Sequence, residues 1–136
     1  SQNLPPRHFF RQWTTANHTP AYAQRFGVRE VSAWGMTEMV AQGMVGDPWS
    51  AQPPRSVGRP SLAYRIYIED DAGKPVAPGE TGHLFVTGVR GLSIFREYDG
   101  AARATADAFD DRGRFITGDR VTLLQDGWIE FADRTK

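Results

Sequence analysis

The sequence has 136 residues, a length that corresponds to about one domain. Sixteen basic and sixteen acidic side chains give a formal net charge of zero, which argues against nucleic acid as a partner. The absence of cysteine excludes disulfides, thiolate metal sites and cysteine nucleophiles. Because the apolar runs are far shorter than the roughly 20 residues of a membrane helix and no signal pattern is present, we expect a cytoplasmic protein without a membrane span.

The first half of the chain predicts a short α/β piece. Apolar spacing over residues 16–26 is typical of one helix face, and Gly27 follows where a left-handed helix end belongs. Alternation over 28–34 predicts a strand that runs into Gly35. Residues 46–60 are rich in proline and glycine, so we expect a loop-rich connection there and a boundary near it.

In the second half the apolar period changes to two, which predicts antiparallel strands. A helix is expected over 101–109 because this stretch is rich in alanine. Strands and turns alternate around it: we expect strands over 62–69, 82–87, 121–124 and 128–131, with hairpin turns at 70–74 and 125–127. The predicted fold class is therefore α+β and mainly β.

Polar groups gather at the expected strand ends, first in the sequence WGMTE at residues 34–38. An aromatic ring, a glycine turn, a hydroxyl at Thr37 and a carboxylate at Glu38 are what an adenine stack with a magnesium–phosphate contact requires. The same pattern also fits a strand followed by a capped turn, with Glu38 exposed to solvent. The residues alone leave both interpretations open.

Two further groups follow. In FITGDR, Asp119 lies beyond Thr117 at the expected mouth of a strand, where a carboxylate can accept hydrogen bonds from a ribose diol. In ADRTK, Arg134 lies just after a hairpin strand and can hold ribose or phosphate oxygens. Each also has an ordinary structural explanation, as a turn aspartate and as an exposed arginine.

Taken in order, these motifs resemble the AMP-forming acyl-CoA synthetases of the adenylate-forming superfamily. The matching segments are WGMTE, SVGRP (56–60), DDAGKPVAPGETGHLFVTG (70–88), EYDGAARATADAF (97–109), GRFITGD (113–119) and QDGWIEFADRTK (125–136). The resemblance implies the end of an α/β nucleotide-binding subdomain over residues 1–55. It implies a distorted antiparallel β-barrel-like subdomain over residues 56–136.

The resemblance also implies roles for individual residues. Thr37 and Glu38 take the catalytic phosphate and magnesium positions, with Glu38 as the metal ligand. The nucleotide-binding positions fall on Trp34, Gly35, Met36, Asp119 and Arg134. The implied reaction uses ATP, Mg²⁺ and a carboxylic acid to form an acyl-adenylate, and coenzyme A then takes the acyl group, as in fatty acid activation.

Two lysine-bearing parts of that family are not found in this sequence. The segment 43–46 lacks the hydroxyls and lysine of the phosphate loop, and the two lysines present, Lys74 and Lys136, match neither catalytic position. We therefore expect an internal fragment of the large N-terminal domain that is inactive alone. Alternatives are an amino-acid-adenylating domain and a stand-alone nucleotide-binding β module.

The N-terminal stretch carries bulky aromatics without a clean period, namely Phe9, Phe10 and Trp13. Such a segment typically packs against another surface. We therefore expect the chain to self-associate.

Overall fold

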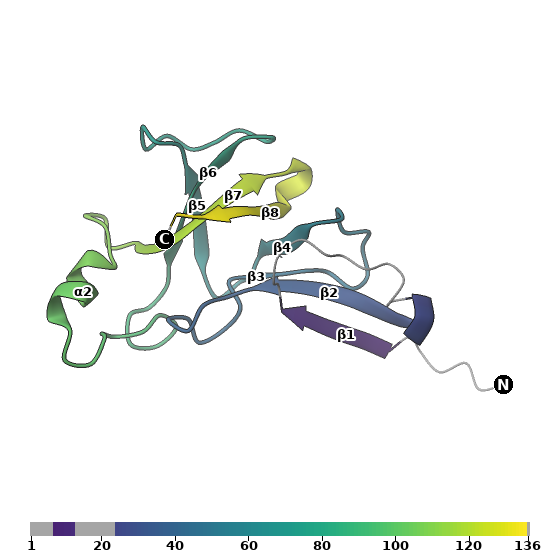
Figure 1. The fold of residues 1–136 in the computed structure, drawn as a ribbon, viewed down its shortest axis with the longest axis horizontal. Coiled ribbons are helices and arrows are strands. Elements are labelled where there is room, and N and C mark those ends of the chain that lie inside the picture. Colours follow the sequence, from purple (N-terminus) through teal and green to yellow (C-terminus); the bar gives the residue numbers. More distant parts are fainter. Residues whose placement is uncertain (1–6, 13–23, 136) are drawn as a thin grey trace.

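The computed structural model describes residues 7–12 and 24–135. Their strands form one eight-stranded sheet in the order β1-β2-β3-β4-β8-β7-β6-β5 (Figure 1). The strands are β1 (Arg7–Gln12), β2 (Val28–Trp34), β3 (Met44–Val45), β4 (Ser56–Pro60), β5 (Arg65–Glu69), β6 (Thr81–Thr87), β7 (Phe115–Leu123) and β8 (Ile129–Arg134). Helix α2 (Ala102–Asp107) and the 3₁₀ turn η1 (Gln125–Gly127) interrupt this series.

The sheet is antiparallel except where β1 pairs with β2 in parallel. Among the described strands, β1 and β5 are the two ends of the order, and no pairing joins them. The prediction of a mainly β fold is confirmed. The barrel-like description is too strong, because the sheet is open.

Two segments differ from the sequence-based expectation because their partners are distant in the chain. Within the expected loop 46–60, Ser56–Pro60 forms β4, which pairs with β3 and with β8. Gly58, with φ of 111°, is required there, because a Cβ would overlap the backbone of Val45. Strand β1 was not expected either, and its pairing is with β2.

The predicted turns are confirmed. Gly73 in the 70–74 turn has φ of 74°, and Asp126 and Gly127 have φ of 58° and 75°, as a tight Asp-Gly hairpin requires. Residues 24–26 are helical and Gly27 has φ of 60°, although most of the expected helix over 16–26 lies outside the described residues. Strand β7 begins earlier than the expected 121–124, because its first half pairs with β6.

The core lies on one face of the sheet and is built by alternation. On β6, Gly82, Leu84 and Val86 are buried while the residues between them are partly exposed. Leu84 and Val86 join one cluster with residues of β2, β3, β4, β7 and β8 and of the loops between these strands. Its buried members are Trp34, Met39, Met44, Val57, Tyr64, Leu84, Val86, Ile94, Phe115, Val121 and Ile129.

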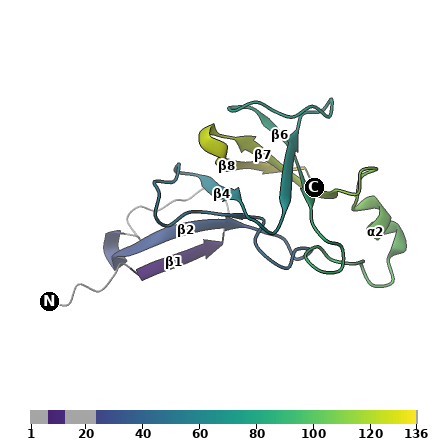
Figure 2. The same cartoon turned by 180° about the vertical axis from the view of Figure 1, so that it is seen from behind.

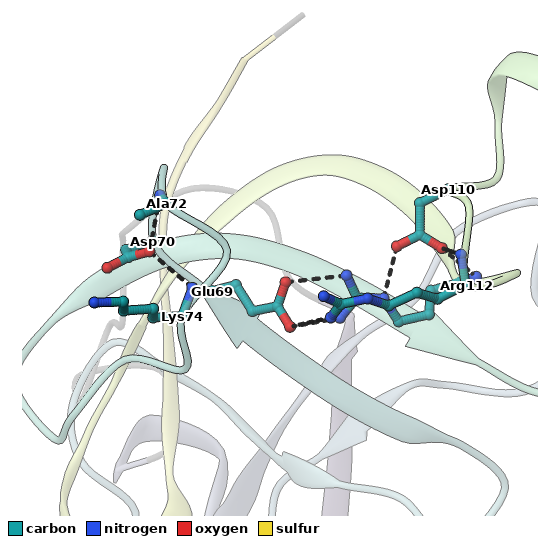
Figure 3. Close-up of polar contacts among 7 residues, drawn as sticks. Glu69, Asp70, Ala72, Lys74, Asp110 and Arg112 are labelled. Carbon is teal, nitrogen blue, oxygen red and sulfur yellow. Dashed lines mark hydrogen bonds and ion pairs between the residues drawn. The ribbon is translucent and has the colours of Figure 1, made fainter.

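A buried ion-pair network links the end of β5 to the segment that precedes β7 (Figure 3). The Arg114 guanidinium donates to both carboxylate oxygens of Glu69, at 2.7 and 3.0 Å, and its Nε donates to Asp110 at 2.7 Å. The same guanidinium lies 4.4 Å from the ring centroid of Phe85. Hydrogen bonding to Arg114 lowers the pKa of Glu69, so this carboxylate is ionised in the folded protein.

Helix α2 lies at the opposite end of the molecule from β1 in both views (Figures 1 and 2). Its one buried residue is Thr105, whose Oγ1 accepts a hydrogen bond from the Tyr98 N–H at 2.9 Å. In the part of the chain that the structure describes, no helix combines the length and apolar character needed to cross a bilayer. The division after residue 55 stays a prediction, and β3 and β4 pair across it.

Candidate functional site

The first wall of the candidate site is the turn that follows β2. Trp34 ends the strand and is 4% exposed, and its carbonyl accepts a hydrogen bond from the Gly43 N–H at 2.8 Å. A Cβ at Gly43 would lie 2.7 Å from Trp34 Cζ3 and 2.8 Å from Met39 Cε. The absence of a side chain at Gly43 therefore leaves room for the indole of Trp34 and the side chain of Met39.

The second wall comes from β7, where Asp119 lies 85 residues further along the chain. The Trp34 indole Nε1–H donates to Asp119 Oδ2 at 2.9 Å, so the turn after β2 and strand β7 meet at this pair. Asp119 is within the strand and not at its mouth, which corrects the sequence-based placement. A register shift follows directly, between Arg120 and Val121, and this irregularity accompanies a polar side chain on a buried face.

Arg134 is brought to Asp119 by strand pairing. The two residues are opposite each other in the β7–β8 ladder, and Arg134 Nε lies 3.3 Å from Asp119 Oδ1. This contact is an ion pair without hydrogen-bond geometry, and Oδ1 is buried with no hydrogen-bond partner among the described residues. One oxygen of the carboxylate therefore has an ion-pair partner but no hydrogen-bond donor among these residues.

The pKa of Asp119 is higher than that of an ordinary aspartate. Burial raises its pKa, and the hydrogen bond from Trp34 and the charge of Arg134 only partly oppose this. The side chain of Asp119 is 5% exposed whereas that of Arg134 is 56% exposed. The charge is thus held in a poorly hydrated position, where an incoming hydrogen-bond donor would be favoured.

The third part is formed by Thr37 and Glu38. Thr37 is exposed and Glu38 is half-buried, and Glu38 Oε1 accepts a hydrogen bond from the Tyr98 hydroxyl at 2.7 Å. Burial, with the Glu38 hydrogen bond, raises the pKa of Tyr98 to about 12. Tyr98 is therefore a neutral donor at physiological pH.

These parts surround a single open cavity of about 730 Å³. All seven residues that the sequence assigned to nucleotide, phosphate or metal line it: Trp34, Gly35, Met36, Thr37, Glu38, Asp119 and Arg134. Phe131, Ala132 and Asp133 complete the lining. Sequence reasoning missed these three, although their position beside Arg134 on β8 was a usable signal. It also gave no role to Tyr98, which lies outside any strand.

Glu38 alone is not sufficient to bind a magnesium ion, which would need further ligands from a bound nucleotide and from water. Carboxylate oxygen is the kind of ligand that Mg²⁺ prefers. Among the described residues, no group of three or more His, Cys, Asp or Glu side chains could hold a metal. A cation at Glu38 would therefore take most of its ligands from phosphates and water, which is typical of nucleotide-bound Mg²⁺.

These residues define an open, mostly antiparallel sheet with a polar cavity between the turn after β2 and the β7–β8 hairpin. The chain belongs to the AMP-binding enzyme family, whose model matches residues 11–130.

Relatives agree with this assignment. The chain is 37% identical over 121 residues to the crotonobetaine/carnitine–CoA ligase of Salmonella paratyphi C, covering 88% of this chain and 23% of that protein. The O-succinylbenzoate coenzyme A synthetase MenE from Bacillus subtilis, solved in complex with AMP, has a TM-score of 0.69 and 28% identity over 84% of this chain and 23% of its own.

A further solved structure shares the fold. MatB from Rhodopseudomonas palustris has a TM-score of 0.82 and 23% identity, covering 96% of this chain and 26% of its own. The chain therefore spans about a quarter of the length of the proteins it matches.

Proposed function

We propose that this chain supplies part of the nucleotide site of an ATP-dependent acid–CoA ligase. Such an enzyme activates a carboxylic acid as an acyl-adenylate and transfers the acyl group to coenzyme A. The observation that carries the proposal is the Trp34–Asp119 pair in a cavity that Glu38 and Arg134 also line. The CoA ligase among the relatives supports the choice of thioester chemistry over amino-acid adenylation.

The proposed roles follow from the chemistry of each group. Asp119, with one oxygen not hydrogen-bonded, accepts from the ribose hydroxyls. Trp34, with Gly35 and Met36, borders the adenine, and Arg134 donates to ribose or phosphate oxygens. Holding the nucleotide in this way orients its α-phosphate for attack by the carboxylate, a contribution of positioning.

Thr37 and Glu38 serve the phosphate end. The Thr37 hydroxyl is exposed in the cavity lining and donates to a phosphate oxygen, and the Glu38 carboxylate holds the cation. When bound, Mg²⁺ neutralises the charge that develops on the phosphates. Because Glu38 is the one carboxylate of this turn, its loss should remove the cation dependence of nucleotide binding.

Nucleotide binding by the 136-residue chain tests the proposal. We expect affinity for ATP·Mg²⁺ weaker than micromolar, seen in NMR spectra as a shift of the Trp34 indole N–H signal. Asp119→Asn should reduce the affinity for AMP about tenfold, because a ribose hydroxyl loses a charged acceptor. The control Asp111→Asn changes an exposed turn aspartate outside the cavity and should leave affinity unchanged. Equal AMP affinity of Asp119→Asn and the unsubstituted chain would contradict the ribose role.

Catalysis is expected to need more than these residues. A carboxylate-dependent ATP–pyrophosphate exchange assay on the 136-residue chain should show no turnover above background, since none of the described residues that line the cavity is a lysine. Clear exchange would overturn the expectation that the chain is inactive alone, and would favour a self-sufficient enzyme.

A further inference from the structure

Tyr98 lies in the segment between β6 and α2 and reaches the candidate site from outside the sheet. Its hydroxyl donates to Glu38 Oε1 at 2.7 Å, across 60 residues of sequence. Among the described residues, no other group hydrogen-bonds to this carboxylate. The Glu38 side chain is thus oriented by one neutral donor that leaves its second oxygen without a hydrogen bond.

The same segment also holds the backbone of the turn that carries Glu38. The Phe95 N–H donates to the Glu38 carbonyl at 2.8 Å, and the Val40 N–H donates to the Ser93 carbonyl at 3.0 Å. An isolated bridge joins Met39 to Ile94 between these two contacts. Glu38 is therefore held at its main chain and at its carboxylate by one stretch of chain.

Tyr98 is itself fixed in place. Its N–H donates to Thr105 Oγ1 at 2.9 Å, and Thr105 is 6% exposed in α2. Its ring lies 4.6 Å from the centroid of Phe95, which in turn stacks on Phe109 at 5.5 Å. The phenol hydroxyl therefore sits on a packed support, and the position of Glu38 Oε1 follows from it.

We propose that Tyr98 is a positioning residue, whose hydroxyl holds the Glu38 carboxylate so that its second oxygen binds the divalent cation of the nucleotide. This inference rests on the function proposed above. A tyrosine is suited to the task because it fixes a carboxylate without neutralising its charge. An arginine or lysine at the same place would compete with the cation for Glu38.

Tyr98→Phe separates this role from a structural one, because it keeps the ring packing and removes the hydroxyl. We expect the Mg²⁺-dependent part of ATP binding to the full 136-residue chain to weaken roughly tenfold. Binding of AMP without metal should stay unchanged. In a Glu38→Gln background, which keeps an acceptor but removes the charge, Tyr98→Phe should have no further effect on Mg²⁺ dependence.

Tyr67→Phe is the matched control, since Tyr67 lies on β5 outside the cavity and its hydroxyl makes no hydrogen bond to any residue that the structure describes. We expect it to bind AMP and ATP·Mg²⁺ as the unsubstituted chain does. An equal loss of AMP and ATP·Mg²⁺ binding in Tyr98→Phe would show a merely structural role and overturn the inference. No change in either would overturn it as well.

A second measurement needs no substitution. With Mn²⁺ in place of Mg²⁺ and ATP present, paramagnetic broadening should affect the ring signals of Tyr98 more than those of Tyr67, and Glu38→Gln should abolish it. Equal broadening at both rings would overturn the inference while leaving nucleotide binding intact. If neither AMP nor ATP perturbs the Trp34 indole signal, the proposed function fails and the inference fails with it.

Discussion

At the scale of single residues, the molecule places one carboxylate where its charge is unfavourable. The side chain of Asp119 is 5% exposed, and its partner Arg134 is largely exposed, so the ion pair between them is screened by water. The remaining compensation is the Trp34 hydrogen bond. A side chain kept under such conditions is typical of a binding site, where function and stability oppose each other.

Asp119→Asn is therefore expected to be at least as stable as the unsubstituted chain at pH 7. Burial raises the pKa of Asp119, so the folded state binds the proton more tightly than the unfolded state. The stability contributed by this group is present at low pH and lost as the pH rises through the raised pKa. Urea unfolding from pH 4 to pH 8 should show the advantage of the asparagine variant growing with pH.

The same measurement on Asp111→Asn should show no such trend, because Asp111 is exposed. The opposite result would be a free energy of unfolding for Asp119→Asn that is much lower than that of the unsubstituted chain at pH 7, by an amount independent of pH. It would show that the carboxylate stabilises the fold.

At the scale of elements, β5 is the last strand of the described sheet and β7 carries Asp119. Arg114, the residue immediately before β7, forms an ion pair with Glu69 at the end of β5 and lies over Phe85 of β6. Removing one partner from such a buried pair leaves a charge without compensation, which is costly. The position of the chain at the beginning of β7 is thus stabilised by the ion pair with β5, the edge strand.

Glu69→Gln should lower the free energy of unfolding by about 3 kcal/mol at pH 7, because Arg114 loses a buried counter-charge. The sign of its pH dependence is opposite to that of Asp119. Arg114 lowers the pKa of Glu69, so the stability it contributes is present above the ordinary value of 4.5 and lost as the pH falls through the lowered pKa. The gap between the two chains should close on acidification.

The exposed Glu80 provides a matched control for the same substitution. Its Oε2 accepts from the Ala77 N–H, and a glutamine oxygen can replace this acceptor. Urea unfolding should place Glu80→Gln within about 0.5 kcal/mol of the unsubstituted chain. A loss at Glu69→Gln no larger than this would contradict the importance of the network.

At the scale of the whole molecule, the described sheet is open and has β1 at one edge. An edge strand presents unpaired N–H and C=O groups that another chain can pair with. Phe9 and Phe10 lie in β1, while Trp13 lies outside the described residues. We expect association that grows with protein concentration, measured by sedimentation velocity.

The double substitution Phe9→Lys and Phe10→Lys should suppress this association, because charge on an edge strand disfavours pairing between chains. A single monomeric species of the unsubstituted chain at all concentrations would refute the prediction. Association of the unsubstituted chain together with a monomeric double-lysine variant would support it.

Local patterns were sufficient for much of the fold. Turn chemistry at Gly73 and Asp126 depends on neighbouring residues, so the hairpins could be predicted from short stretches of sequence. Strand β4 and the first half of β7 could not, because their stability comes from partners far along the chain. The site shows the same division: its individual residues were found as motifs, whereas their contacts were not.

By itself, the sequence determined the mainly β character, the turns and the set of polar residues that resembles adenylate-forming enzymes. Those features depend on side-chain type and short-range spacing. Only the tertiary structure decided that the sheet is open, that Trp34 donates to Asp119, and that Tyr98 holds Glu38. These facts depend on which distant strands pair and on which side chains their registers bring within hydrogen-bond reach, and no local pattern carries that information.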